Sequence, residues 1–393
     1  MAKTRSHGQP SFFSFSTAST FDRIRAVRDA RALVNNYQVI QDQVPNQSIL
    51  PMIKADAYGH GATWAARQLL QMPALYGFGL ATFEEAKELR KELGADGKRV
   101  KLIVFSGAIP WSDEKGQFCE KFNVTPVIAS DQDWQAFLKG GWPARIAYEL
   151  KFNTGLNRLG MSLNSAPTVA KTLRNRPAVE HPAGVFSHLV MSEDPDSKVS
   201  LSQKEKFIWL KRELGEALPA TQFHLGNSAA IWNQKHWGLK DLTDVVRPGL
   251  ALYGVPPWKG APAKGLKQVL TLEAQVVHRH RLKAGEAVGY GATFKVKGNE
   301  PIQVATLAAG YADGISRMLS GKGFVWLRGR KMRVLGRVSM DLCAVECPME
   351  TKVGDWAEFL GPNIDPWEQA EAAETIPYEL LTSISSRVQR IDG

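Results

Sequence analysis

The chain has 393 residues and a formal net charge of +10 at pH 7, with 44% hydrophobic and 22% charged residues. This composition is typical of a folded globular protein and excludes the disordered and fibrous classes, and the length suits two or three domains. The basic residues are interleaved with acidic ones and form no block of five or six, so we expect no nucleic-acid partner.

Targeting signals and cysteines indicate the compartment. No apolar stretch reaches about 18 residues, which predicts no membrane-spanning helix and no membrane partner. The first 20 residues lack the apolar segment of a secretory signal, and the Ser/Thr-rich run 11–20 reads as part of an N-terminal tail over 1–30, for which we expect disorder. The odd cysteine count favours a reducing, cytoplasmic location. Cys343 and Cys347 have no second pair and no nearby histidine, so we expect no metal site.

A repeating unit occupies the first two thirds of the chain. A short β-rich run, a loop and an amphipathic segment recur, with the runs at 49–53, 75–81, 100–105, 124–129, 145–150, 184–188, 221–224 and 243–247. Helical spacing of apolar residues follows at 62–71, 83–93, 131–138, 166–174 and 201–217. Eight βα units predict an α/β fold, a (β/α)8 TIM barrel over 31–262. The alternative is a doubly wound open sheet, but no Gly-x-Gly-x-x-Gly follows a strand.

The pattern changes after about residue 265. Alternating apolar residues at 269–277, 302–307, 323–328 and 332–338 are separated by glycine-containing turns, which predicts a C-terminal, mostly β domain over 263–393. Pro256, Pro257, Gly260 and Pro262 mark the junction. The segment 378–390 reads as a short terminal helix.

The strongest local feature is the segment IKADAYGHG at 53–61. It places Lys54 directly after an apolar strand, at the end of a barrel strand where active sites are built. Partial desolvation lowers the pKa of a lysine there and frees its amine to form a Schiff base. A lysine that only extends its ammonium into water at a strand end is the alternative.

Six motifs, taken together and in order, resemble one family. The segment 53–61 resembles the signature of fold-type III pyridoxal-phosphate enzymes, specifically the alanine racemases. Five further blocks are similar to motifs of that family: KFNTGLNRLG (151–160), HLGNSA (224–229), RPGLALYG (247–254), GYADG (310–314) and GRVSMD (336–341). The resemblance covers about residues 30–390. It implies the cofactor pyridoxal 5'-phosphate.

The resemblance implies two acid/base residues on opposite faces of the substrate's Cα. Lys54 would hold the cofactor and act on one face, and Tyr311 would act on the other. Tyr311 and Met340 lie in the predicted β domain, and in the family they come from the other subunit, which implies a homodimer with shared active sites. A tyrosine with a pKa of about 10 is a poor base at neutral pH unless its neighbours stabilise the phenolate. His188 matches the family's histidine beside that tyrosine.

The remaining family roles concern the cofactor. Arg247 matches the arginine that faces the pyridine nitrogen; since an arginine only donates, the nitrogen would stay unprotonated and the ring would be a weaker electron sink. The phosphate is expected in the loops after the seventh and eighth strands, where backbone N–H groups and a hydroxyl are available. Its expected ligands are Asn227, Ser228, Gly249, Leu250, Tyr58 and Tyr378.

Other matched positions concern the substrate. Arg158 matches an arginine near the cofactor's phenolic oxygen and the substrate carboxylate, and Met340 one that contacts that carboxylate through its backbone. Lys151 matches a lysine that is often carbamylated, and a carbamate could orient Arg158. Tyr290 resembles a residue near the substrate entrance. The chain departs from the family at two positions. Asn153 stands where the family usually has aspartate, and Ser339 stands where it often has cysteine.

The resemblance implies an alanine racemase that supplies D-alanine for peptidoglycan. A racemase of the same fold with broader, serine or lysine specificity is the alternative, and a decarboxylase fits the motifs less well. A non-catalytic pyridoxal-phosphate-binding barrel is a different class. Such proteins lack a second domain, so Tyr311 and the β-rich region beyond the barrel argue against it.

Overall fold

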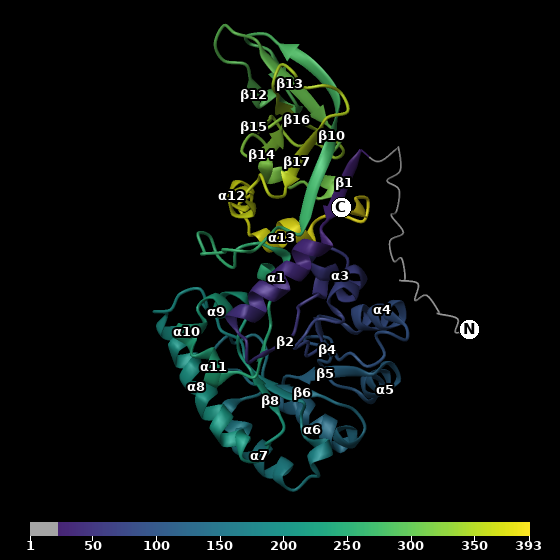
Figure 1. Cartoon of the computed structure of the whole chain (residues 1–393), viewed down its shortest axis with the longest axis vertical. Helices are drawn as coiled ribbons and strands as arrows, with labels where there is room; N and C mark the ends of the chain where they lie inside the picture. The colour runs from purple at the N-terminus through teal and green to yellow at the C-terminus, as the bar shows by residue number, and fades with distance from the viewer. Residues whose placement is uncertain (1–22) are drawn as a thin grey trace, which may run out of the picture.

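The computed structural model describes residues 23–393, and the serine-rich run 11–20 lies outside them. It has two parts, a barrel and a β-rich domain, which lie one above the other (Figure 1). Among residues 23–393, no helix is both long and apolar enough to cross a bilayer.

The barrel is built from eight parallel strands, as the sequence predicts. Six of them pair in chain order, β3 to β8, and β2 pairs with β9. The parallel bridges Ile49–Leu75, Met52–Gly79 and Asn227–Arg247 join β2 to β3 and β8 to β9, which closes the ring. The strands are β2 (Ser48–Ile49), β3 (Phe78–Leu80), β4 (Leu102–Val104), β5 (Val124–Ile128), β6 (Glu149–Lys151), β7 (Gly184–Phe186), β8 (Gln222–His224) and β9 (Val245–Val246).

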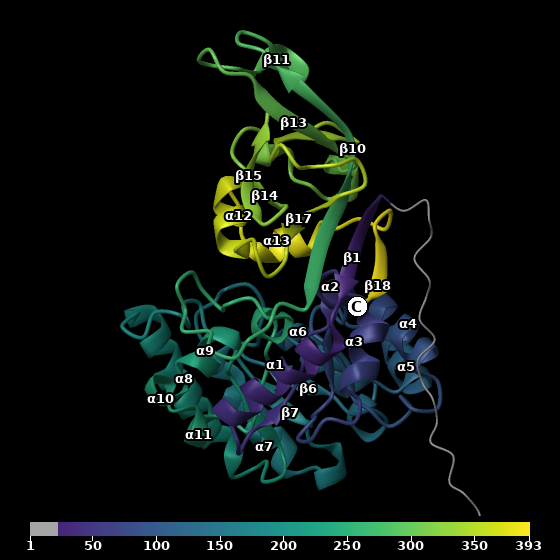
Figure 2. The same cartoon turned by 45° about the horizontal axis from the view of Figure 1, so that its top comes forward.

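Helices surround the barrel (Figures 1 and 2). They are α1 (Ala30–Gln43), α3 (Ala62–Leu69), α4 (Phe83–Leu93), α5 (Asp113–Phe122), α6 (Asp131–Lys139), α7 (Ala166–Arg174), α8 (Lys198–Gly215), α9 (Ser228–Trp232), α10 (Gln234–Trp237) and α11 (Leu239–Leu242). The five segments predicted as helices each form one. Local chemistry fixes several starts: Thr82 and Glu85 form a reciprocal capping box at α4, and Ser130 caps α6.

The side chains of the short strands alternate between two packing environments. In β4, Leu102 and Val104 pack in the large cluster beneath the helices, whereas Ile103 belongs to a small cluster inside the barrel. In β6, Leu150 packs outward, which turns Glu149 and Lys151 inward. The barrel interior therefore holds charged groups near its C-terminal mouth, where function is expected.

The second domain is an eight-stranded sheet in the order β13-β16-β15-β14-β17-β10-β1-β18. The thirteen-residue strand β10 alternates buried and partly exposed positions over its first half, as predicted, and runs along the whole domain (Figure 2). The domain comprises β10 (Leu270–Leu282), β11 (Ala287–Val288), β12 (Phe294–Lys295), β13 (Ile302–Leu307), β14 (Phe324–Leu327), β15 (Arg330–Leu335), β16 (Cys343–Glu346), β17 (Trp356–Leu360), α12 (Pro366–Ala372) and α13 (Pro377–Thr382).

Both ends of the described chain differ from expectation. Residues 24–28, placed in the N-terminal tail by the sequence, form β1 (Ile24–Arg28), which pairs antiparallel with β10 and parallel with β18 (Gln389–Asp392). The predicted terminal helix over 378–390 is wrong in its second half, because α13 ends at Thr382 and residues 389–392 are the strand β18. Both short strands are stabilised by partners far away in sequence, and a local pattern does not reveal such partners.

Candidate active site

A strained turn presents Lys54 at the mouth of the barrel. The four residues that follow it, Ala55 to Tyr58, have φ between 51° and 55°. L-residues disfavour this left-handed region by roughly 1–2 kcal/mol each. Such strain persists only where the surroundings enforce it, and it is concentrated at functional sites.

Contacts from four elements hold this turn. Glu85 of α4 accepts the N–H of Ala55 at 2.7 Å, and Asp56 accepts the N–H of Ala62 at 2.7 Å. Arg390 of β18 donates to the carbonyl of Gly59 at 3.1 Å, and Arg28 of β1 donates to that of His60 at 3.2 Å. The β domain therefore braces the lysine turn of the barrel.

Four cationic side chains lie near the mouth, and in residues 23–393 none of them takes part in an ion pair. They are Lys54, Lys151, Arg158 and Arg247. Burial lowers the pKa of Lys54, and the charge of Arg158 lowers it further. Burial, together with Arg158, Arg247 and Lys54, lowers the pKa of Lys151 to about 8. Such a cluster needs negative charge from a bound group.

His188 is neutral and oriented by Arg247. Burial, with the charges of Arg247 and Lys151, lowers the pKa of His188 to about 3. Arg247 is 3% exposed and donates from Nη2 to the carbonyl of Ser187 at 2.8 Å, and that nitrogen lies 3.4 Å from His188 Nδ1. Since a guanidinium only donates, Nδ1 of His188 accepts and its proton is on Nε2. His188 therefore offers one N–H donor.

A cradle of hydroxyl groups forms beside the lysine turn. Ser228 Oγ accepts N–H groups from Gly249 at 2.9 Å and Ala251 at 3.4 Å, which leaves its own proton for a ligand. The expectation of a free Gly249 amide is therefore wrong. The role of Gly249 is steric, because a Cβ there would lie 2.4 Å from Tyr58 Oη. The Tyr58 and Tyr378 rings are 5.8 Å apart, and burial raises the pKa of both phenols, which keeps them as donors.

The other expected residues near the cradle have mixed roles. The Asn227 side chain caps α9, since its Oδ1 accepts the N–H of Ala230 and the hydroxyl of Ser192. Leu250 is fully buried at the start of the turn after β9. Asn153 holds the loop before Arg158 by accepting the N–H groups of Gly155 and Asn157. It does so without a charge, whereas the family's aspartate would add one next to Lys151.

Three expected residues lie elsewhere. Tyr311, Met340 and Tyr290 are in the β domain, with 44%, 52% and 72% of their surface exposed. A Cβ on Gly310 would lie 2.2 Å from the Met340 carbonyl, so this glycine allows Tyr311 and Met340 to share one surface. Tyr311 lines a cavity of about 390 Å³ whose other described residues all come from 314–383, and Lys54 is not among them. Within the described residues, the cavity beside Tyr311 is thus separate from the surroundings of Lys54.

The sequence reasoning missed several supporting residues. Glu85, Arg28 and Arg390 hold the lysine turn, and no motif marks them. Glu149 and His224 lie inside the barrel beneath Arg247. The alternation along β6 and β8 was the available signal, since Leu150 and Phe223 pack outward on either side of these strands.

The residues at the mouth fit pyridoxal 5'-phosphate. A phosphate suits a hydroxyl-lined cradle, and an anionic ring system suits cations that lack carboxylate partners. The aldehyde needs an amine whose pKa is lowered, which Lys54 supplies. The barrel, its lysine and the attached β domain define a class of two-domain enzymes that bind an anionic cofactor at a barrel mouth.

The chain belongs to the alanine racemase family. The model of the alanine racemase N-terminal domain matches residues 29–257, and that of the C-terminal domain matches residues 269–392. An alanine racemase of Lawsonia intracellularis is 33% identical over 371 residues, 90% of this chain and 93% of its own. One of Nitrosococcus oceani is 33% identical over 374 residues, 93% of this chain and 98% of its own. The family acts on amino acids as isomerases with pyridoxal phosphate as cofactor.

Solved structures agree with this assignment and with the predicted fold class. The biosynthetic alanine racemase of Pseudomonas aeruginosa has a TM-score of 0.83 at 30% identity, covering 95% of this chain and 100% of its own. An alanine racemase of Bartonella henselae, solved with covalently bound pyridoxal phosphate, has a TM-score of 0.80 at 30% identity, with coverages of 95% and 100%.

Proposed function

We propose that the chain interconverts L- and D-alanine by a two-base mechanism in a site that two subunits share. Lys54 acts on one face of the substrate's Cα, and Tyr311 of the partner subunit acts on the other. The observation that carries the proposal is the Lys54 amine, whose pKa is lowered and which lies among cations without carboxylate partners at the barrel mouth. It rests also on membership of the family.

The cofactor, when bound, withdraws electrons from the substrate's Cα so that its proton is acidic. Tyr58, Tyr378 and the Ser228 hydroxyl would hold its phosphate, and Arg247 would donate to its ring. Lys54 then takes or returns a proton at its Nζ, and its lowered pKa fits this exchange near neutral pH. His188 would donate its Nε2–H toward the phenolic oxygen of the partner subunit's Tyr311 and stabilise the phenolate.

Arg158 would receive the substrate carboxylate, and Lys151 would orient Arg158. The Lys151 amine, with a pKa of about 8, is partly neutral at physiological pH. A neutral amine can attack carbon dioxide, forming an N–C bond and releasing one proton. The resulting carbamate would place a negative charge beside Arg158. Met340 and Tyr290 would line the substrate side of the shared site from the β domain.

A mixing experiment tests the shared site. Lys54→Ala and Tyr311→Phe each remove one acid/base group, and we expect each variant to have little activity alone. When the two are mixed and allowed to exchange subunits, half of the dimers are mixed, and each mixed dimer carries one intact site. About one quarter of wild-type activity should return. A site contained within one chain would give no recovery, and that result would refute the proposal.

Initial rates with L-alanine, L-serine and L-lysine test specificity. We expect alanine to be fastest, and a faster rate with lysine or serine would contradict the substrate assignment. Supply of D-alanine for peptidoglycan from the cytoplasm is part of the proposal. It predicts rescue of a bacterium that requires D-alanine, with Lys54→Ala as the inactive control.

A further inference from the structure

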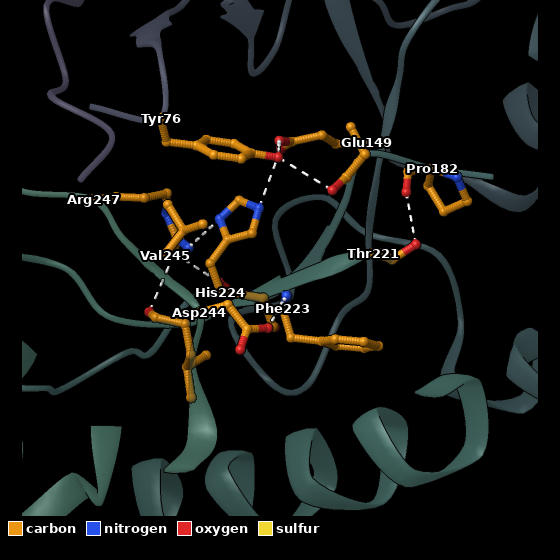
Figure 3. Close-up of polar contacts among 12 residues, drawn as sticks. Tyr76, Glu149, Pro182, Thr221, Phe223, His224, Asp244, Val245 and Arg247 are labelled. Atoms are coloured by element: carbon orange, nitrogen blue, oxygen red, sulfur yellow. Dashed lines mark hydrogen bonds and ion pairs between the residues drawn. The ribbon is translucent and has the colours of Figure 1, made fainter. Parts of the chain in front are cut away.

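Beneath the mouth, the barrel interior contains a row of polar side chains, of which the proposed mechanism uses only Arg247. Figure 3 shows His224 between Arg247 and Glu149, with the Tyr76 hydroxyl close to Glu149. Glu149 and His224 are 0% exposed, and Tyr76 comes from the segment just before β3. A carboxylate and an imidazole in such a place need partners, because an unpartnered buried charge costs several kcal/mol.

Arg247 fixes the tautomer of His224. Nη1 of Arg247 donates to Nδ1 of His224 at 2.9 Å. Because a guanidinium has no lone pair to offer, Nδ1 must be unprotonated, so a neutral His224 carries its proton on Nε2. That nitrogen lies 3.3 Å from Oε2 of Glu149.

Glu149 accepts at the other end of the row. The Tyr76 hydroxyl lies 3.3 Å from its Oε1 and 3.2 Å from the carbonyl of Ala183, and its single proton serves these two acceptors. In residues 23–393, Oε2 of Glu149 and Nε2 of His224 have no hydrogen-bond partner, and they lie 3.3 Å apart as an ion-pair contact, so each faces only the other. Arg247 therefore donates to His224, and the Nε2 of His224 faces the carboxylate of Glu149.

The chain leaves space for this contact. A Cβ on Gly184 would lie 2.8 Å from His224 Nε2 and 2.9 Å from Glu149 Oε1. Gly184 pairs with Glu149 between β7 and β6, and its φ does not require glycine. Glycine is therefore needed at position 184 because it lets Glu149 and His224 approach each other, and not because of the backbone conformation.

We infer that Glu149 is a positioning residue for the racemisation, which acts through His224 to balance the charge of Arg247 and to fix the direction of its guanidinium. The inference rests on the proposed function, since Arg247 is the group expected to face the cofactor ring. Glu149 touches neither cofactor nor substrate.

The charges around the row agree with this role. Arg247 is buried beside Lys151, and the carboxylate of Glu149 raises its pKa, against the effect of burial. Burial lowers the pKa of His224, while Glu149 and Asp244 act in the opposite sense. Tyr76 and Lys101, whose Nζ lies 4.0 Å from the Tyr76 ring centre, complete the polar groups near Glu149.

The first test uses the wild-type holoenzyme. Nitrogen-15 NMR of labelled histidines, with His224→Gln for assignment, should show His224 with a protonated Nε2 and a bare Nδ1 from about pH 6 to about pH 9. A protonated Nδ1, or titration of the ring in this range, would overturn the inference. This measurement does not depend on which amino acid the enzyme acts on.

The second test removes only the negative charge. We expect Glu149→Gln to lower kcat at least about tenfold with KM changed less than about twofold, since misplaced catalytic groups affect the transition state most. The absorbance band of the bound cofactor should shift as well. Glu358→Gln is the matched control, because Glu358 is also a buried carboxylate but supports a turn of the β domain. A Glu149→Gln enzyme with the wild-type kcat and cofactor band would overturn the inference.

A third variant separates this inference from the proposed function. Gly184→Ala should push His224 and Glu149 apart and shift the absorbance band of the bound cofactor as Glu149→Gln does. An unchanged band would count against the role proposed for Glu149. If wild-type enzyme failed to racemise alanine, the proposed function would fail, while the histidine tautomer and the cofactor band would still report on Glu149. If Glu149→Gln did not fold, the wild-type NMR result would decide.

Discussion

The buried cations at the barrel mouth differ from surface lysines and arginines in what surrounds them. Burial and the charge of Arg158 lower the pKa values of Lys54 and Lys151, although Glu85 acts in the opposite sense on Lys54. Close packing around Gly249 acts in a different way, because the missing Cβ is what allows the Tyr58 hydroxyl into the cradle. The absence of a single carbon atom at Gly249 therefore decides whether the Tyr58 hydroxyl can reach the cradle.

Gly249→Ala should weaken cofactor binding. The new Cβ would lie 2.4 Å from Tyr58 Oη, so the phenol must move out of the cradle. Loss of one hydrogen bond to a charged group costs about 1.5–3 kcal/mol, which predicts at least a tenfold rise in the Kd of pyridoxal phosphate for the apoenzyme. Gly215→Ala is the control, because its Cβ would meet nothing within 4 Å. Equal affinities of the two variants would contradict this account of the cradle.

Lys151 should make the apoenzyme more stable at alkaline pH. Its pKa is about 8 when folded and 10.5 ordinarily, so between these values the unfolded chain binds more protons and stability rises with pH. Below pH 8 the buried charge of Lys151 destabilises the folded state to its full extent, and about 2 kcal/mol of this destabilisation should disappear by about pH 9.5. In buffers without carbon dioxide, the Tm of wild type should rise by a few degrees relative to that of Lys151→Met between these conditions. Parallel Tm profiles would show that Lys151 has no lowered pKa.

Sequence reasoning located the chemical residues better than the residues that support them. Lys54, Arg247 and Ser228 belong to local motifs at strand ends, and the structure brings them to the same mouth. Glu149 and Arg390 act across the fold from distant segments, and neither stands in a recognisable motif. The hydrogen bond of the Gly249 amide could not be predicted from the sequence either, because it depends on the orientation of the Ser228 side chain.

At the scale of elements, the lysine turn depends on strands from the opposite domain. β1 and β18 lie side by side, and their arginines reach the carbonyls of His60 and Gly59. Arg390 also donates to the carbonyls of Ile384 and Ser385, which ties the segment after α13 to the same point. Strain in the turn is thus balanced by contacts outside it.

Arg390→Met should loosen the lysine turn. The substitution keeps most of the aliphatic volume but removes the donors to several carbonyls, which should cost about 1–3 kcal/mol. We expect a lower Tm and a faster dissociation of pyridoxal phosphate. Arg333→Met is the control, since Arg333 is exposed and pairs with Glu346 on the surface, a contact worth at most about 1 kcal/mol. If both variants released the cofactor at the wild-type rate, the hydrogen bonds of Arg390 to the lysine turn would have no effect on cofactor binding.

Regular elements were predictable where their pattern was local. The eight barrel strands and α4 and α7 follow from apolar runs and helical spacing. The strand β1 was missed because only Ala26 of its five residues is fully buried, and its partner β10 lies more than 240 residues away. In the segment 378–390, Leu381, Ile384 and Val388 have helical spacing, but only Leu381 lies in α13, and Ile384 and Val388 fill the β-domain core from the irregular segment after it.

At the scale of the whole molecule, the described residues begin with a strand of the β domain, pass through the barrel and return to the β domain. β1 ends at Arg28, and β10, its antiparallel partner, begins at Leu270. The barrel is thus an insertion between the first strand and the rest of the β sheet. The two parts are linked through β1, the lysine turn and β18 (Figure 2).

This arrangement sets an order of events on the ribosome. At about 5–20 residues per second, β1 leaves the ribosome roughly 12–50 seconds before β10 is made. The barrel can close during that interval, while β1 waits as an exposed edge that other chains could pair with. Arg390 of β18 is synthesised only after the barrel and the strands β10 to β17. The lysine turn is therefore expected to be the last part of the barrel to become rigid.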